Sequence, residues 1–155
     1  MVNMERRKAL KTGGGLGLLG VLAVLGLIPG SAWAGIGRAA LEAGNLSDAF
    51  DALGVTIPEN SELIRLTVPD VAENGAVVPV TVESSLAHIE QISILVDKNI
   101  NVLAANFIIP KGVAGFITTR IKIGQTATVV ALVKADGKFY RASKEVQVTQ
   151  GGCSA

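Results

Sequence analysis

The stretch TATVVALVKADGKFYRASKEVQV, residues 126–148, decides the fold. It holds two apolar-rich runs, 126–134 and 138–148, on either side of Asp136-Gly137. An Asp-Gly pair between such runs is the strongest short signal for a β-hairpin, because glycine accepts the positive φ that an inverse turn demands. The stretch therefore predicts two antiparallel strands, the second of which ends near Val148 or Thr149.

Five further strand-like runs precede this hairpin, at residues 63–68, 76–83, 89–96, 102–109 and 116–123. Alternation of inward and outward residues dominates them, and Pro69 stops the first run. Pro79 lies inside the second run and argues for an edge strand or a bulge there. Seven short strands with turns about every 8–12 residues predict a mainly β fold, an antiparallel β-sandwich of immunoglobulin-like type.

The segment 35–53 differs from the rest, because its apolar residues recur at helical spacing with an interruption near Gly44. It predicts one or two short helices, ended by Gly54 as a C-cap. The length of 155 residues fits one domain. With only four Phe, one Trp and one Tyr, its core must consist mainly of Val, Ile, Leu and Ala. That composition favours packed strands over an aromatic pocket.

The N-terminus has the order of an export signal. Four basic residues, Arg6, Arg7, Lys8 and Lys11, precede an uncharged, glycine-rich apolar run at 13–28, and Ala32-Trp33-Ala34 supplies small residues for a signal peptidase. We expect a signal peptide at 1–34. Residues 5–11, ERRKALK, resemble a twin-arginine signal with Arg6 and Arg7 as its pair, which indicates export in the folded state. The alternative is an uncleaved anchor, because residues 13–34 are just long enough to cross a hydrocarbon core of roughly 30 Å.

Cleavage after Ala34 would leave 10 basic and 12 acidic residues, a net charge of −2, which disfavours a nucleic-acid partner. The chain holds a single cysteine, Cys153, in the tail QGGCSA at 150–155. An unpaired thiol in an oxidising compartment calls for a role. Two glycines before it are costly to order, so we expect the thiol on an arm outside the core. The five residue steps from Val148 to Cys153 give a reach of roughly 17 Å.

Other motifs carry less weight. The pattern GLGLLG at 15–20 matches a dinucleotide fingerprint but lies inside the apolar run of the signal and follows no strand. His88 is the only histidine, so it is interpreted as a structural or surface residue and no metal site is expected. Asn45-Leu46-Ser47 fits a glycosylation sequon, yet Ser47 and Asp48 serve equally well as helix caps. One histidine and a tail thiol do not make a hydrolytic triad.

The signal-like N-terminus, the strand-rich domain at 35–149 and the final Gly-Gly-Cys together resemble the SoxY family, the covalent carriers of the sulfur-oxidising (Sox) system. That family ends in Gly-Gly-Cys-Gly-Gly. Gly151, Gly152 and Cys153 match this motif, whereas Ser154 and Ala155 replace the last two glycines.

The resemblance implies an immunoglobulin-like fold, a heterodimer with a SoxZ-like subunit, and a periplasmic location without stable membrane insertion after cleavage. It also implies that thiosulfate or sulfide is coupled oxidatively to Cys153 by the c-type cytochrome SoxXA. The dimanganese hydrolase SoxB would then release sulfate, and a sulfane dehydrogenase, where present, would oxidise the remaining sulfur. The carrier itself would be no enzyme and would bind no cofactor. Residues 150–155 would be its carrier arm.

Two other function classes remain open from the residues alone. One is a structural or adhesin-like exported β-sandwich with an idle terminal Cys153. The other is a periplasmic redox or metallochaperone module, which predicts a bound metal or a defined low thiol pKa. Unchanged function after replacement of Cys153 with Ser would support the first.

Overall fold

The structure is a computed structural model that describes residues 31–149, with side chains from residue 37 onward. The chain separates into two units, Met1–Gly35 and Ile36–Ala155, and the second holds the strands. Helix α3 (Ser31–Glu42) includes the bond between Ala34 and Gly35 at which cleavage is expected. The rest of the expected signal peptide, with Arg6 and Arg7, lies outside the described residues. Between residues 31 and 149, no helix is long and apolar enough to cross a membrane.

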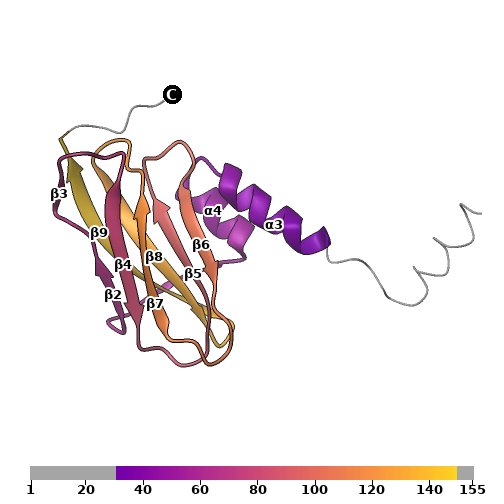
Figure 1. The fold of residues 1–155 in the computed structure, drawn as a ribbon. Coiled ribbons are helices and arrows are strands. Elements are labelled where there is room, and N and C mark those ends of the chain that lie inside the picture. The colour runs from indigo at the N-terminus through magenta and orange to yellow at the C-terminus, as the bar shows by residue number, and fades with distance from the viewer. Residues whose placement is uncertain (1–30, 150–155) are drawn as a thin grey trace, which may run out of the picture. The chain divides into compact units, whose positions relative to one another are not determined.

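Two sheets form a sandwich (Figure 1). The larger sheet has the order β1 (Glu59–Asn60), β9 (Lys138–Val148), β8 (Ala127–Ala135), β5 (Ile89–Val96), β6 (Leu103–Ile108), and β3 (Val71–Ala72) also pairs with β9. The smaller sheet has the order β2 (Ile64–Thr67), β4 (Val78–Ser84), β7 (Gly115–Ile121). The mainly β, immunoglobulin-like sandwich is confirmed, and all seven predicted strands are present.

The two strands that the sequence did not predict are β1 and β3, each two residues long. Both pair with β9 in parallel, so the larger sheet is not purely antiparallel. A two-residue strand has too few residues to show alternation, which explains why the pattern gave no sign of either. Together they occupy the side of β9 that does not face β8.

The predicted hairpin between β8 and β9 is confirmed. Ala135 pairs with Lys138, and the two residues between them, Asp136 and Gly137, have φ values of 49° and 72°. Positive φ at both central positions is the backbone of a type I′ turn, whose twist matches that of the flanking strands. The ladder then runs without a register shift to Ala127, which pairs with Val146.

The main core lies between the sheets and consists of aliphatic side chains, as the composition predicts. Its largest fully buried members are Val78, Val80 and Val82 of β4, Ile92, Ile94 and Val96 of β5, and Val129 and Val133 of β8, together with Ile123. A second cluster lies on the outer face of the larger sheet, where Leu95, Val130 and Leu132 meet α3 and α4 (Leu46–Leu53). β8 is therefore buried on both of its faces.

The predicted helical segment is confirmed as two helices separated near Gly44, and Gly54 ends α4 with a left-handed φ of 74°. The expected capping residues were wrong in detail. Asn45, not Ser47 or Asp48, is the N-cap of α4, and its Oδ1 accepts a hydrogen bond from the Asp48 amide at 2.9 Å. The Asn45 side-chain amide also donates to the Asp48 carboxylate at 2.8 Å. The sequon asparagine thus serves as a helix cap.

The expectation that Pro79 marks an edge strand or a bulge is wrong for the strand as a whole. β4 is the middle strand of the smaller sheet, and its pairing with β7 shows no bulge. β2, however, pairs only with residues 81–84 of β4, so Pro79 lies beyond the end of β2. Proline is tolerated there because its missing N–H would have pointed to the side on which β2 has already ended.

Gly115 at the start of β7 offers a sharp test of the close contacts that β7 makes with β4 and with the Ile89 side chain. A Cβ on this residue would lie 2.9 Å from the backbone oxygen of Ser84 and would overlap the end of the Ile89 side chain. We expect Gly115→Ala to destabilise the fold by about 1–3 kcal/mol, since the Ser84 backbone cannot yield cheaply. Urea unfolding measures the change. Gly124→Ala is the matched control, because its Cβ would meet nothing closer than 3.7 Å. Equal loss in both variants would contradict the argument.

Candidate functional site

Cys153 and the rest of the tail at 150–155 lie outside the described residues, so the site is built from the strand that leads to it. β9 ends at Val148, as predicted, at the opposite end of the sandwich from the β8–β9 hairpin (Figure 1). The end of this strand is held from both sides. On one side the ladder with β8 runs as far as Val146, and on the other side Gln147 and Val148 pair in parallel with β3.

Hydrogen bonds hold the backbone one residue further than the strand itself. The Val148 amide donates to Thr126 Oγ1 at 3.0 Å, and the Thr149 amide donates to the Ala72 carbonyl at 3.1 Å. The Thr149 hydroxyl also donates to the Glu73 carbonyl at 3.3 Å. We call these residues the strand-end clamp: Thr126, Val148 and Thr149, together with Ala72 and Glu73, whose carbonyls accept the two hydrogen bonds from Thr149. The clamp fixes the chain up to residue 149, four residue steps before Cys153.

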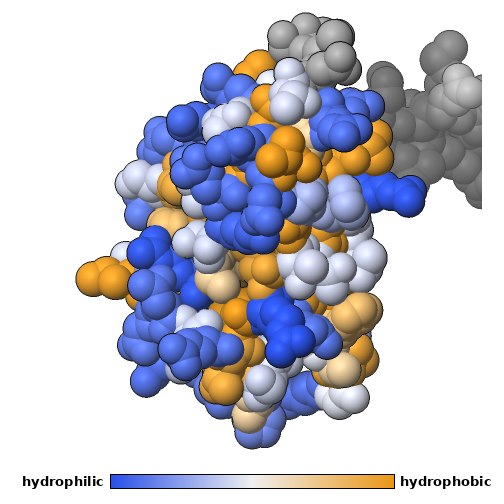
Figure 2. Space-filling view, turned by 90° about the vertical axis from the view of Figure 1, so that its left-hand side faces the viewer, coloured by the Kyte–Doolittle hydropathy of each residue, from blue (hydrophilic) through white to orange (hydrophobic). Residues whose placement is uncertain are grey.

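Charged groups reinforce the clamp through β3. Lys144 lies on β9, and its amine donates to the Val68 carbonyl at 2.9 Å and pairs with the Asp70 carboxylate at 2.9 Å. The Gln147 amide donates to the Asp70 carbonyl at 2.9 Å. These contacts hold residues 68–70, which precede β3, against β9. The side of the sandwich on which β2, β3 and β9 lie is mainly hydrophilic, with apolar residues in small groups between (Figure 2).

Sequence reasoning named the thiol and the glycines but missed Thr126, Thr149, Lys144 and Asp70. The pattern offered one weak signal, the segment Pro69-Asp70-Val71-Ala72 after the first strand, which reads as a loop. Its pairing with β9 joins residues about 76 positions apart, a distance along the chain that no local pattern reveals.

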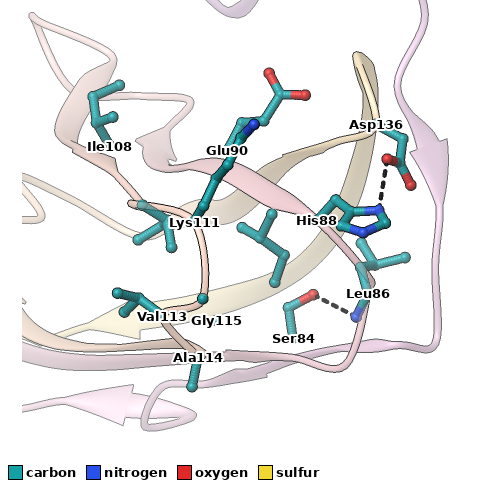
Figure 3. A pocket seen from close by; sticks show the side chains of 13 residues that line it. Ser84, Leu86, His88, Glu90, Ile108, Lys111, Val113, Ala114, Gly115 and Asp136 are labelled. Atoms are coloured by element: carbon teal, nitrogen blue, oxygen red, sulfur yellow. Dashed lines mark hydrogen bonds and ion pairs between the residues drawn. The ribbon is translucent and has the colours of Figure 1, made fainter.

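A pocket of about 1070 Å³ lies at the other end of the sandwich, near the β8–β9 hairpin (Figure 3). Its lining is mainly apolar, with Leu86, Ile89, Ile108 and Val113, and Glu90 and Lys111 stand at its rim. Ten residue steps of β9 separate Lys138 from Val148, so at about 3.3 Å per residue this pocket is roughly 33 Å from the strand-end clamp. The described residues that line this pocket are therefore far from the strand-end clamp.

His88 lies at this pocket and not at the end of β9. Its side chain is 81% exposed, and its Nδ1 lies 2.9 Å from Asp136 Oδ1 of the hairpin turn. Among residues 31–149, no group of three His, Cys, Asp or Glu side chains comes together as metal ligands. The surface interpretation of His88 fits these contacts.

Glu90 is held beside the same turn. The Gly137 amide donates to its Oε1 at 2.9 Å, and Lys134 lies 3.2 Å from its Oε2. The hydrogen bond from Gly137, followed by the bond from the Lys134 amine, lowers the pKa of Glu90 below its ordinary value of 4.5. Both contacts stabilise the hairpin turn, so we interpret the Glu90 carboxylate as a structural group.

The strand-end clamp makes a direct prediction about the backbone that leads to the thiol. Thr126→Val keeps the shape of the side chain but removes the acceptor of the Val148 amide. We expect a loss of about 1 kcal/mol, equivalent to roughly fivefold faster amide exchange at Val148. Thr128→Val is the control, because the bonds shown for Thr128 involve its backbone, which accepts from and donates to Asp97. Unchanged exchange at Val148 in Thr126→Val would refute the role of Thr126.

Comparisons with known proteins show which family the chain belongs to. The family model described as sulfur oxidation protein SoxY matches residues 50–153, which include Cys153. Among solved structures, the sulfur carrier protein SoxY from Chlorobium limicola f thiosulfatophilum is 37% identical, with a TM-score of 0.62, over 68% of this chain and 96% of that one. The bacterial superantigen toxic shock syndrome toxin-1 is 14% identical with a TM-score of 0.36, over 54% of this chain and 99% of that one. No curated protein sequence matches. The chain belongs to the SoxY family and is a sulfur-carrier protein of the Sox system.

Proposed function

We propose that this protein carries sulfur from thiosulfate or sulfide covalently on the thiol of Cys153 and presents it to the other Sox enzymes. The observation that carries the proposal is the family match at 50–153, which includes the only cysteine of the chain. That cysteine follows the strand-end clamp by four residues. A thiol just beyond a fixed strand end is well placed to be handed from one enzyme to another.

Loading is an oxidation at sulfur. The Cys153 thiol loses its proton, its sulfur bonds to the sulfane sulfur of thiosulfate, and a pair of electrons leaves to a c-type cytochrome of the SoxXA kind. The product is a Cys153 thiosulfonate disulfide. Hydrolysis by a SoxB-like enzyme then adds water at the terminal sulfur, releases sulfate and leaves a persulfide on Cys153. A sulfane dehydrogenase, where present, would oxidise that persulfide.

Covalent attachment suits this cargo. Thiosulfate is a small, strongly hydrated anion that offers little surface for binding, whereas a tether keeps it at high effective concentration near each enzyme. We assign the redox and hydrolytic steps to these partner enzymes, so that each of them needs to recognise only the arm and its anchor.

The reach of the arm is set by the strand-end clamp. Because Thr149 is hydrogen-bonded through both its amide and its hydroxyl, the arm begins at Gln150 and not at Val148. Four residue steps from Thr149 to Cys153 span about 13–14 Å at full extension, shorter than the roughly 17 Å expected from the strand end. Gly151 and Gly152 have no Cβ, so this part of the arm is as thin as a chain can be. Ser154 and Ala155 add little width.

We further propose that the SoxYZ complex implied by the family forms here with a SoxZ-like subunit, and that the protein works in the periplasm. Export through a signal peptide at 1–34, with Arg6 and Arg7 as a twin-arginine pair, would bring it there folded.

The carrier role makes a prediction that separates the thiol from its neighbours. In a reconstituted system with thiosulfate and a SoxXA-type cytochrome, intact-protein mass spectrometry should find the adduct on Cys153, and Cys153→Ser should abolish it. Gly152→Val, which widens the arm beside the thiol, should leave unfolding and the reaction with small thiol reagents unchanged but slow enzymatic loading at least tenfold. Gln150→Ala is the matched control. Wild-type loading in Gly152→Val would contradict the argument that the arm must be thin beside the thiol, and would leave the carrier role intact.

The export proposal has its own test. The mature protein isolated from the periplasm should begin at Gly35 by mass analysis, and Arg6→Lys with Arg7→Lys should retain the precursor in the cytoplasm. Lys8→Arg with Lys11→Arg is the control, since it alters charged residues of the same region without changing the pair. Export of the lysine variant would show that the general secretory route is used instead.

A further inference from the structure

The free edge of β7 differs from every other edge among the described strands. β1 and β3 cover the outer side of β9. β2 has four residues, is followed closely by Pro69 and lies beside β9. The pairing of β6 with β5 shifts register between Ile94 and Leu95 of β5, and Pro110 follows β6 closely. Bulges, prolines and short length are the ordinary means of protecting an edge. β7 has seven residues, no proline and no bulge, and Arg120 is the one charged side chain along it.

The pairing pattern shows which backbone groups face that edge. The Ser85 amide donates to the Leu63 carbonyl, so the odd-numbered residues of β4 bond toward β2 and the even-numbered ones toward β7. Through the register of β4 with β7, Thr119 and Ile117 then bond toward β4. Thr118 and Arg120 turn their amides and carbonyls the other way, where no described strand receives them.

The side chains along this edge are a mixture of apolar and basic groups. Phe116 is 54% exposed, although a residue of this size is usually buried. Arg120 is opposite Pro79 on β4 and, like Lys111 at the rim of the pocket, makes no ion pair within residues 37–149. Elsewhere on the surface, Arg65 pairs with Glu83 and Lys134 pairs with Glu90.

The pocket described above continues this edge. Gly115, the first residue of β7, lines it, and so do Val113 and Ile108, which are 54% and 70% exposed (Figure 3). A strand that pairs along β7 therefore extends past Gly115 over an apolar hollow. Lys111 stands at the rim of that hollow.

We infer that the free edge of β7 and the adjoining pocket bind an extended edge strand of the partner subunit, which becomes the fourth strand of the smaller sheet. Backbone hydrogen bonds to Thr118 and Arg120 supply the pairing. The uncompensated charges of Arg120 and Lys111 select a strand with a carboxylate opposite Arg120, and Phe116 and the pocket select apolar side chains nearer to Gly115. The choice of a SoxZ-like chain as this partner rests on the proposed function.

The test uses the full carrier and its SoxZ-like subunit, with the dissociation constant measured by calorimetry and amide exchange measured at Thr118 and Arg120. The complex should protect both amides. Thr118→Pro removes the outward amide and should weaken binding at least tenfold, whereas Thr118→Val keeps it and should bind as the wild type does. Both variants lose the bond between the hydroxyls of Thr118 and Thr81, so that loss cancels.

A second pair of variants, which changes charge and inserts no proline, keeps the inference testable if Thr118→Pro does not fold. Arg120→Glu should weaken the complex about tenfold or more, while Lys138→Glu, an exposed lysine at the start of β9, should not. Unprotected amides, equal binding by Thr118→Pro and Thr118→Val, absence of any complex, or self-association through β7 in place of the partner would each overturn the inference. Loading of Cys153, measured separately, reports on the carrier proposal, so the two can fail independently.

Discussion

The burial of β8 on both faces is the constraint on which the rest of the structure depends. Val129, Ala131 and Val133 point into the sandwich, while Val130 and Leu132 contact the helical cluster on the outside. A strand of this kind cannot lie at the surface without exposing one of its apolar faces. Its neighbours β5 and β9 are thereby fixed in register, and the end of β9 is held at one end of the sandwich. The position from which the arm leaves the domain follows from this burial.

The sequence predicts the strands well because the signals are local. Alternation located the five strands before the hairpin, and Asp136-Gly137 with its flanking runs located the last two. Alternation indicates that one face of a strand is buried, but it does not reveal that α3 and α4 cover the other face of β8. The run Val129–Val133 is continuously apolar because both faces of β8 are buried, but the run alone does not say what covers the second face.

The candidate site, too, could be predicted from the sequence only in part. Cys153 and its glycines are predicted from the sequence alone, because a lone thiol in a glycine-rich tail stands out without any neighbour in space. The strand-end clamp is not, because Thr126, Thr149 and Ala72 come together only through the sheet, and β3 is too short to show a pattern. The free edge of β7 is likewise a property of strand order. No feature of residues 115–121 alone says that β7 lies at the end of a three-stranded sheet.

The free edge of β7 and the strand-end clamp are joined by one short segment of chain. β7 ends at Ile121, and Thr126, whose hydroxyl receives the Val148 amide, follows five residues later. This segment is itself held, because Ile123 donates to the Gly75 carbonyl at 2.7 Å and Gly124 donates to Asn99 Oδ1 at 3.0 Å. Asn99 in turn donates to the Lys122 carbonyl at 2.7 Å. A strand added along β7 would thus reach a rigid connection that leads from the end of β7 at Ile121 to the clamp. In the proposed complex, the partner strand and the strand-end clamp would then share a fixed frame.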